Sequence, residues 1–353
     1  MGRHAFTFDW VTAIILLCLG SFGLFILLTI SEKYFVQQLM YLVVAFVLLF
    51  AVSRIDAELL WWFAPVGYVL SNIFLLLSYL GPSIRGATRW ILVFGVQLQP
   101  SELVKPFLIL AFAYFMTKYS PRKLSSLPIL TGLFIVPFLL VFKQPDLGSS
   151  IVYASFWGAM LLAGGLPVWI LLAGGALGVL CLPFVWSHLA AYQKSRIETF
   201  LNPGLDPKGA GYNAIQAMIA VGSGQLFGRG LGRGTQSHLR FLPEFHTDFI
   251  FATIIEELGF IGGILLLSGY GTLLYRIIAP FVRGAVENIR LFIFSFGLFA
   301  MLLSQVFINI GMNMGLIPVT GITIPFVSYG GSSLLSTAVS FGLLWAIARG
   351  NRS

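Results

Sequence analysis

The stretch WVTAIILLCLGSFGLFILLTI, from Trp10 to Ile30, decides the fold, because it contains no charged residue. A helix of this length spans the roughly 30 Å hydrocarbon core of a bilayer, since each residue adds about 1.5 Å. The run is longer than the apolar core of a secretory signal peptide, and no small-residue cleavage site follows it. We therefore expect a retained transmembrane helix.

Similar runs recur along the whole chain of 353 residues, of which 58% are hydrophobic and only 10% charged. Soluble domains carry about 25% charged residues, so this chain has too little polar surface for water. The runs lack the two-residue alternation of barrel strands. The sequence predicts one all-α, polytopic integral membrane domain over residues 1–353 with about ten transmembrane helices. They are expected at residues 10–30, 36–53, 59–80, 101–117, 126–142, 149–165, 167–187, 248–275, 290–310 and 330–348.

The basic residues between the runs predict the orientation of the chain. The net charge of +8 is scattered over short loops, a pattern that reports membrane orientation rather than nucleic-acid binding. The positive-inside rule places both termini in the cytoplasm, with Arg3, Arg54, Lys118, Arg122, Lys123, Arg276, Arg283, Arg290, Arg349 and Arg352 on that side. The opposite short loops hold only Lys33, Arg85, Arg89 and Lys143. One long loop, residues 188–247, is then extracytoplasmic, and its aromatic, proline and glycine residues favour an ordered structure.

Two opposite charges lie inside the fourth apolar run. Glu102 and Lys105 are three residues apart and share one face of a helix. Ionisable residues inside a membrane are functional candidates, because burying a charge there costs free energy. The pair either neutralises itself and locks helix packing, or holds open a polar cavity that reaches a substrate headgroup. Pro100, just before it, suits the start of a helix.

The long loop ends with FLPEFHTDFIF, from Phe241 to Phe251, which places Asp248 where the loop becomes a span. An aspartate there can be an ordinary helix N-cap. Alternatively, Glu244, His246 and Asp248 gather at the membrane surface, where a carboxylate can act as a general base. Spacing alone leaves both interpretations open.

The stretch GLIPVTGITIPFVSYGGSS, from Gly315 to Ser333, joins the last two runs, and its prolines and glycines prevent a regular helix before Gly330. A glycine-rich turn that opens a helix can direct backbone N–H groups at a phosphate. A re-entrant loop packed between helices is the alternative. Upstream, three amides four residues apart line one helical face and form either interhelical hydrogen bonds or a polar wall; they are Gln305, Asn309 and Asn313.

Three further carboxylates are expected to be structural. Asp146 is most simply the N-cap of the sixth span. Glu256 and Glu257 follow Asp248 by about two to three helical turns, and as buried carboxylates they need partners or protons.

Several catalytic motifs are absent from the sequence. The chain has no phosphate-binding loop ending in Gly-Lys-Ser/Thr, which excludes an ATP-driven pump, and no Asp-x-Asp metal motif for a nucleotide-sugar donor. The sequences His-Glu-x-x-His and Gly-x-Ser-x-Gly of common membrane hydrolases are also absent.

Seven segments together resemble the SEDS proteins of bacterial cell-wall synthesis, in order and over most of the chain. Within that family, Gly-Thr-Gln-Ser followed by Phe-Leu-Pro-Glu and His-Thr-Asp-Phe is closer to the RodA branch, which acts in elongation, than to the FtsW branch, which acts in division. The segments are residues 99–105, 144–150, 206–216, 222–232, 234–237, 242–251 and 318–333.

The resemblance implies a peptidoglycan glycosyltransferase of the bacterial cytoplasmic membrane that polymerises lipid II into β-1,4-linked glycan at the outer leaflet. It implies a class B penicillin-binding protein as partner, and cell shape as the process served. By position, Asp248 matches the family's essential aspartate, and Glu102 and Lys105 match its intramembrane pair. The family's final-loop motif corresponds to Ser328, Tyr329, Gly330, Gly331 and Ser332.

This activity would need a base for the acceptor 4-hydroxyl and cations beside the departing diphosphate. Asp248 is the expected base, and the expected phosphate contacts are Arg85, Arg89, Lys105 and Arg196. A divalent cation, Mg²⁺ or Mn²⁺, could bridge the diphosphate, although the sequence contains no evident protein cage for it. Gln225 departs from the family, which often has a second glycine there.

Two classes of function remain open at this point: the polymerase, and a flippase that moves lipid-linked precursor across the bilayer. A flippase should line a route through the whole membrane with polar groups. The candidate residues instead crowd the outer half and the long loop, which favours the enzyme.

Overall fold

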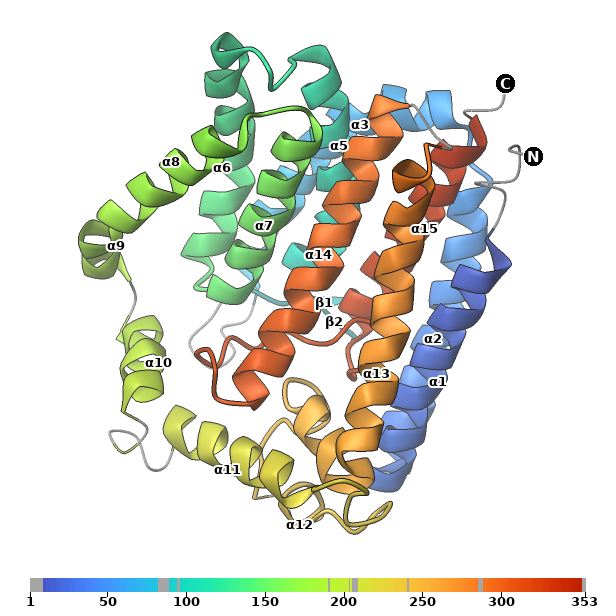
Figure 1. Ribbon diagram of the computed structural model, residues 1–353, viewed down its shortest axis with the longest axis vertical. Coiled ribbons are helices and arrows are strands. Elements are labelled where there is room, and N and C mark those ends of the chain that lie inside the picture. The colour runs from blue at the N-terminus through green and yellow to red at the C-terminus, as the bar shows by residue number, and fades with distance from the viewer. Residues whose placement is uncertain are drawn as a thin grey trace.

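The computed structural model describes residues 9–81, 89–93, 96–189, 191–202, 204, 209–239, 241–284 and 288–350. These residues form a bundle of long helices, with both chain ends at one end of the molecule (Figure 1). The helices are α1 Trp10–Ile30, α2 Glu32–Ser53, α3 Ala57–Leu77, α4 Pro100–Leu103, α5 Lys105–Lys118, α6 Leu127–Lys143, α7 Leu147–Ala163, α8 Val168–Leu180, α9 Leu182–His188, α10 Ala191–Leu201, α11 Ala210–Ser223, α12 Thr235–His238, α13 Ile250–Val282, α14 Ile289–Asn313 and α15 Gly331–Gly350. Short 3₁₀ turns cover Ser78–Leu80 and Leu124–Ser126, and a small antiparallel hairpin pairs β1 Ile91–Val93 with β2 Val96–Leu98.

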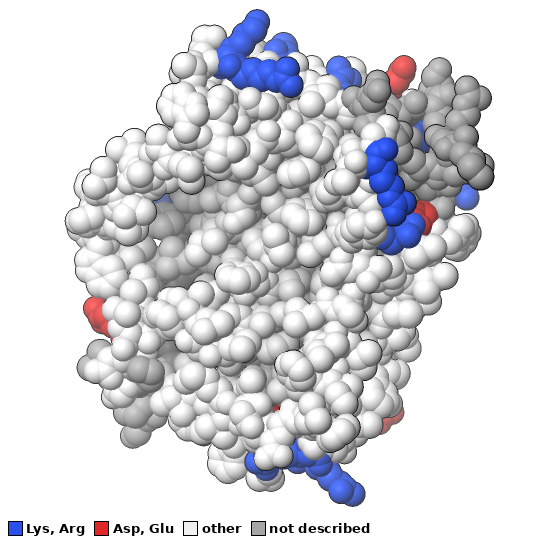
Figure 2. All heavy atoms as spheres, in the orientation of Figure 1, with Lys and Arg blue, Asp and Glu red and all other residues white. Residues whose placement is uncertain are grey.

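The predicted all-α membrane architecture is confirmed. Seven helical stretches of the described chain are long and apolar enough to cross a bilayer, and α7 and α8 are shorter apolar helices. Each of the ten apolar runs corresponds to one of these helices or to a broken pair of helices. Most charged side chains of the visible face lie towards its two ends, and the surface between them is largely uncharged apart from an acidic group at the left edge (Figure 2).

Three of the expected spans are broken rather than continuous. The fourth run divides at Val104, just before Pro106, into α4 and α5, and the seventh divides at Cys181 into α8 and α9. The helix α13 contains a non-helical residue, Gly259, with φ 68° and ψ −164°. Prolines account for the first two interruptions, since each new helix has one in its first turn.

The long loop is ordered in its described residues and contains α10, α11 and α12. With α8 and α9, it forms an arc along one edge of the molecule in Figure 1. The side chains of α8 are exposed rather than buried in the bundle.

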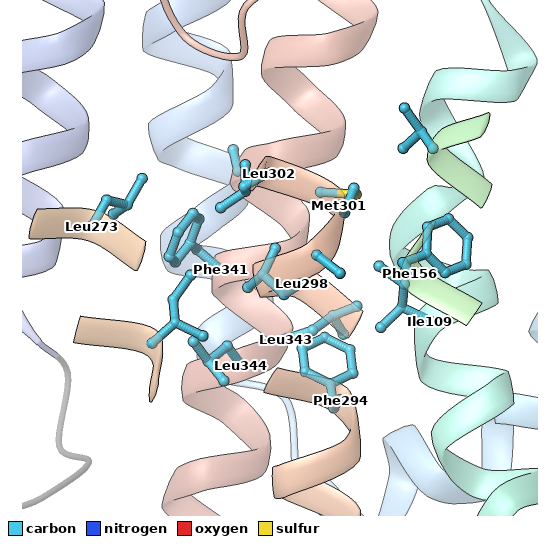
Figure 3. Close-up of a cluster of buried hydrophobic side chains, with 14 of the residues drawn as sticks. Ile109, Phe156, Leu273, Phe294, Leu298, Met301, Leu302, Phe341, Leu343 and Leu344 are labelled. Carbon is cyan, nitrogen blue, oxygen red and sulfur yellow. The ribbon is translucent and has the colours of Figure 1, made fainter. Parts of the chain in front are cut away.

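The core is centred on α14, which lies between two groups of helices. Leu298 and Met301 of α14 stand between Phe156 of α7 on one side and Phe341 and Leu344 of α15 on the other (Figure 3). All five side chains are buried. Because α14 packs on both sides, residues near its C-terminal end, such as Asn309 and Asn313, can connect segments that are far apart in sequence.

Candidate active site

The segment between α14 and α15 returns into the bundle as a re-entrant loop. The side-chain amide of Asn309 donates a hydrogen bond to the Ile322 carbonyl at 2.6 Å, and the Tyr270 hydroxyl donates to the Pro325 carbonyl. Gly321, in this loop, has a positive φ of 77°, a conformation that glycine adopts without steric cost. The loop is thus fixed from both α13 and α14.

Asp248 lies in the turn before α13 and is half-buried. The N-cap residue of α13 is Phe249, and the Asn313 side-chain oxygen accepts a hydrogen bond from the Ala252 backbone N–H in the first turn at 3.1 Å. The helix therefore begins one residue later than an N-cap at Asp248 would predict. The Asp248 carbonyl accepts hydrogen bonds from Asn309 at 2.9 Å and Asn313 at 3.1 Å, so the amides of α14 hold the backbone of this turn.

The side chains of Asp248 and Arg89 both lie beside Gly321. A Cβ atom built on this glycine would lie 3.3 Å from Oδ2 of Asp248 and 3.9 Å from Nη2 of Arg89. A carboxylate and a guanidinium that are 159 residues apart in sequence thus flank one backbone position of the re-entrant loop. A side chain at position 321 would crowd both groups.

The other arm of Arg89 reaches Asp146. The distance from Nη1 to Oδ1 of Asp146 is 3.6 Å, and the side chains are 20% and 1% exposed. Asp146 is the N-cap of α7, as expected, and it also accepts hydrogen bonds from Gln99 at 2.9 Å and from the Ser149 hydroxyl at 2.9 Å. The sequence analysis missed its pairing with Arg89, because no local pattern connects residues 57 positions apart.

Arg196 reaches the same loop from α10. Its Nη1 donates a hydrogen bond to the Val319 carbonyl at 3.0 Å. Two of the four expected phosphate contacts, Arg89 and Arg196, are thus brought beside residues 319–321, near Asp248. Arg85 lies outside the described residues.

Lys105 does not reach this surface. It is fully buried, and its Nζ lies 2.5 Å from Oε1 of Glu102. Gln305 of α14 donates to the other carboxylate oxygen of Glu102 at 3.4 Å. The pair is therefore locked between helices, as the packing interpretation predicts, and α14 connects it to Asn309 and Asn313 at the site.

The final-loop turn is held by α2 and by the chain before α4. The Ser328 carbonyl accepts from Gln38 at 3.0 Å, and the Ser332 hydroxyl accepts from the Gln99 backbone at 3.0 Å. The Tyr329 hydroxyl donates to Gln37 at 2.7 Å, and Gly331 faces the ring of Tyr41. The Gly330 backbone donates to Gln38 at 3.3 Å. These contacts are those of a re-entrant loop packed between helices.

The two polar residues that precede Asp248 in the same turn, Glu244 and His246, contact other partners. The ring of His246 stacks on Tyr34, with centroids 4.2 Å apart, and the Glu244 carboxylate accepts from Thr247 at 3.1 Å. Both side chains support the turn that carries Asp248.

Glu256 and Glu257 have the structural roles expected of them. Glu256 accepts hydrogen bonds from the backbone N–H of Gln236 at 2.9 Å and from the Ser237 hydroxyl at 3.2 Å, so it anchors α12. Glu257 lies 2.9 Å from a ring nitrogen of His238 and accepts from Thr29 at 3.1 Å. Each carboxylate ties the long loop to α13.

The site therefore combines one half-buried carboxylate with two guanidinium groups around a rigid loop. A carboxylate can accept a proton, and guanidinium groups can bind phosphate oxygens with paired N–H donors. Within the described part of the chain, no three or more His, Cys, Asp or Glu side chains come together in a group that could hold a metal ion.

Comparison with known proteins identifies relatives along nearly the whole chain. The model of the FtsW, RodA and SpoVE family, described as cell cycle protein, matches residues 5–353. The peptidoglycan glycosyltransferase MrdB of Escherichia coli K12 is 38% identical over 85% of this chain and 82% of its own. Stage V sporulation protein E of Bacillus subtilis is 38% identical over 90% and 87%, and a probable peptidoglycan glycosyltransferase FtsW of Trichlorobacter lovleyi is 35% identical over 97% and 93%.

Solved structures share the fold. RodA of Thermus thermophilus superimposes with a TM-score of 0.73 at 28% identity, covering 99% of both chains. A chain from a study of how a peptidoglycan synthase complex coordinates polymerization and crosslinking gives a TM-score of 0.83 at 29% identity, covering 98% of both chains. From the sequence match and the shared fold, the chain belongs to the FtsW/RodA/SpoVE family, the SEDS proteins that its motifs resemble.

Proposed function

We propose that Asp248 is the general base with which this chain, a peptidoglycan glycosyltransferase, polymerises lipid II into β-1,4-linked glycan at the outer face of the cytoplasmic membrane. The enzyme class follows from curated relatives of that name, which match this chain over more than four fifths of both lengths. The observation that carries the role of Asp248 is its position: the residue lies just before the N-cap of α13, and its carboxylate lies beside Gly321 together with Arg89.

In the proposed reaction, Asp248 accepts the proton of the acceptor sugar's 4-hydroxyl while that oxygen attacks the anomeric carbon of the donor. The bond between that carbon and the lipid diphosphate breaks, and its electron pair leaves with the diphosphate. Arg89 and Arg196 would bind the departing phosphates, because fixed cations stabilise charge that develops in the transition state. The turn from Ser328 to Ser332 would support the loop. Lys105 would contribute by its buried pairing with Glu102, which holds the helices together, and not by contact with the substrate.

A lipid-linked diphosphate donor needs no nucleotide site, which agrees with the absence of an Asp-x-Asp motif. A divalent cation that bridges the two phosphates remains part of the proposal. Since the described residues contain no group of three or more potential ligands, the diphosphate would provide most of the coordination, and we assign the ion no step. Loss of polymer in EDTA, restored by Mg²⁺ or Mn²⁺, would support this ion.

The flippase alternative has less support. Its strongest candidates were the intramembrane charges, yet Glu102 and Lys105 pair with each other and are buried. Asp248, Arg89 and Arg196 all lie around residues 319–321 rather than along a path through the bundle.

The test is polymer formation from labelled lipid II by purified Asp248→Asn. We expect a loss of rate on the order of 10²-fold or more, because asparagine cannot accept the proton. The melting temperature should match that of the parent, since asparagine keeps the size of aspartate and caps a helix about equally well. The matched control is Asp56→Asn at the N-cap of α3, where asparagine caps equally well and polymer should be unchanged. Near-normal polymer from Asp248→Asn would refute the assignment.

We also propose that the chain belongs to the RodA branch, that both termini are cytoplasmic, and that a class B penicillin-binding protein crosslinks its product. The solved RodA fold supports the first of these proposals, and the clustering of basic loops supports the second. The third follows from the similar chain in a synthase complex that coordinates polymerization and crosslinking.

A further inference from the structure

We infer that Asp146 is a positioning residue for the polymerase reaction, which holds one arm of Arg89 so that the other arm faces the reacting centre at Asp248. The inference rests on the proposed function. It concerns a carboxylate whose local role, the N-cap of α7, does not require a cation beside it.

The two arms of Arg89 point to different partners. Nη1 lies 3.6 Å from Oδ1 of Asp146, whereas Nη2 lies 3.9 Å from the Cβ position of Gly321, which is 3.3 Å from Oδ2 of Asp248. The guanidinium therefore lies between a buried carboxylate, Asp146, and the position of Gly321, beside which the proposed base also lies. Its Nε is buried and has no hydrogen-bond partner among the described residues, so Arg89 retains N–H donors for an anionic ligand.

Asp146 itself is rigidly held. Its Oδ2 accepts hydrogen bonds from Gln99 at 2.9 Å, from Ser101 at 3.4 Å and from the Ser149 hydroxyl at 2.9 Å, and its Oδ1 accepts from the Ser149 backbone at 3.1 Å. Four donors on a carboxylate that is 1% exposed prevent its reorientation. A fixed anion behind a partly exposed guanidinium restricts the directions that the guanidinium can take.

A double-mutant cycle tests the inference in the purified enzyme with labelled lipid II. Asp146→Asn keeps an acceptor oxygen for the cap, and we expect kcat/KM to fall roughly 10-fold. Arg89→Gln should reduce it by about 10²-fold. In the double variant, loss of the Asp146 charge should add less than about twofold to the effect of Arg89→Gln, because Asp146 acts through Arg89. A purely structural Asp146 would give effects that multiply, which would overturn the inference.

Arg89→Lys tests the same point without altering Asp146, and therefore decides the question if Asp146→Asn folds poorly. A lysine ammonium keeps the charge but has no second arm, so kcat/KM should fall nearly as far as in Arg89→Gln. Recovery to within about threefold of the parent would show that one point charge suffices and would refute the bridging role. If the parent polymerises lipid II and Asp248→Asn does not, multiplicative effects at Asp146 and Arg89 refute this inference alone and leave the proposed function intact.

Discussion

Glu102 and Lys105 form an ion pair that water does not reach. Lys105 has no exposed surface, and its closest partner oxygen is 2.5 Å away. Burying two charges costs free energy that their mutual attraction offsets only in good geometry. The ion pair therefore contributes less to the free energy of unfolding than the removal of one partner would cost, because that removal leaves the other charge buried and unpaired.

The single variants Glu102→Ala and Lys105→Ala should each lower the melting temperature and the folded yield more than the double replacement does. Each single change leaves an uncompensated charge in a low-dielectric interior, at a cost on the order of 3–5 kcal/mol. Thermal unfolding in detergent measures the effect, with the exposed Lys123→Ala as control. A double variant no more stable than either single variant would contradict the pairing.

Gln225 shows how a departure from the family pattern is accommodated. It has a φ of 47°, in the left-handed region that favours glycine, and its carbonyl accepts a hydrogen bond from the Phe260 backbone at 2.9 Å. The conformation thus agrees with the glycine often found in the family at this position. A straight side chain such as glutamine tolerates it better than a β-branched one.

At the scale of the element, the break in α13 at Gly259 allows the loop after α11 to cross the helix. The backbones of Arg229 and Gly230 donate to the carbonyls of Glu256 and Glu257, and Phe260 and Ile261 donate back to the loop. The crossing leaves no room for a side chain: a Cβ on Gly259 would lie 2.3 Å from the Gly228 nitrogen. The short first part of α13, which follows Asp248, is thereby fixed to the long loop.

Gly259→Ala should destabilise the protein by at least about 2 kcal/mol, because it combines a strained positive φ with a backbone clash. Gly271→Ala is the matched control in the same helix, since a Cβ there meets nothing within 4 Å and alanine favours helix. Melting temperature and polymer yield should both fall for the first variant and stay unchanged or rise for the second. Equal melting temperatures for the two variants would show that the crossing carries little stability.

At the scale of the whole molecule, the loops that predict the orientation lie at opposite ends of the bundle. The connection between α5 and α6 lies at the same end as the two termini, and α12 lies at the opposite end (Figure 1). Basic side chains occur at both ends of the visible face (Figure 2). The orientation is therefore predicted by the excess of lysine and arginine in the short loops of one side, and not by the presence of basic residues alone.

Single cysteines at Lys123 and Arg233 should label differently in intact spheroplasts. We expect an impermeant thiol reagent to modify position 233, outside, and to spare position 123, inside, because basic short loops remain in the cytoplasm. The background variant replaces Cys18 and Cys181, which are exposed on the helices. Permeabilised cells, in which both positions should react, provide the control, and the reverse pattern in intact spheroplasts would overturn the orientation.

Affinity purification from native membranes in mild detergent should recover a single-span penicillin-binding protein at near-stoichiometric level. The proposal follows from the similar chain in a synthase complex that coordinates polymerization and crosslinking, and apolar helix contacts can hold such a complex in the membrane. An unrelated polytopic protein with the same tag is the control. Reproducible absence of the partner would count against the elongation branch.

The sequence by itself determined the membrane class, the positions of the helices and the residues most worth attention. Long apolar runs are a strong signal, because a lipid environment requires every spanning backbone group to bond within a helix. Asp248 stands at the start of an apolar run, where spacing alone left an N-cap and a general base both open, and the family resemblance singled it out. The sequence also predicted the pairing of Glu102 with Lys105, because residues three apart share a helical face.

Only the tertiary structure decided which of these residues act together. The contact of Arg89 with Asp146, the meeting of Asp248 and Arg89 at Gly321, and the hydrogen bonds from Asn309 and Asn313 to Asp248 all join residues distant in sequence. It also placed the N-cap of α13 at Phe249, one residue after Asp248. Local periodicity reports which face of a helix a residue occupies, whereas the neighbour across that face depends on how the helices pack.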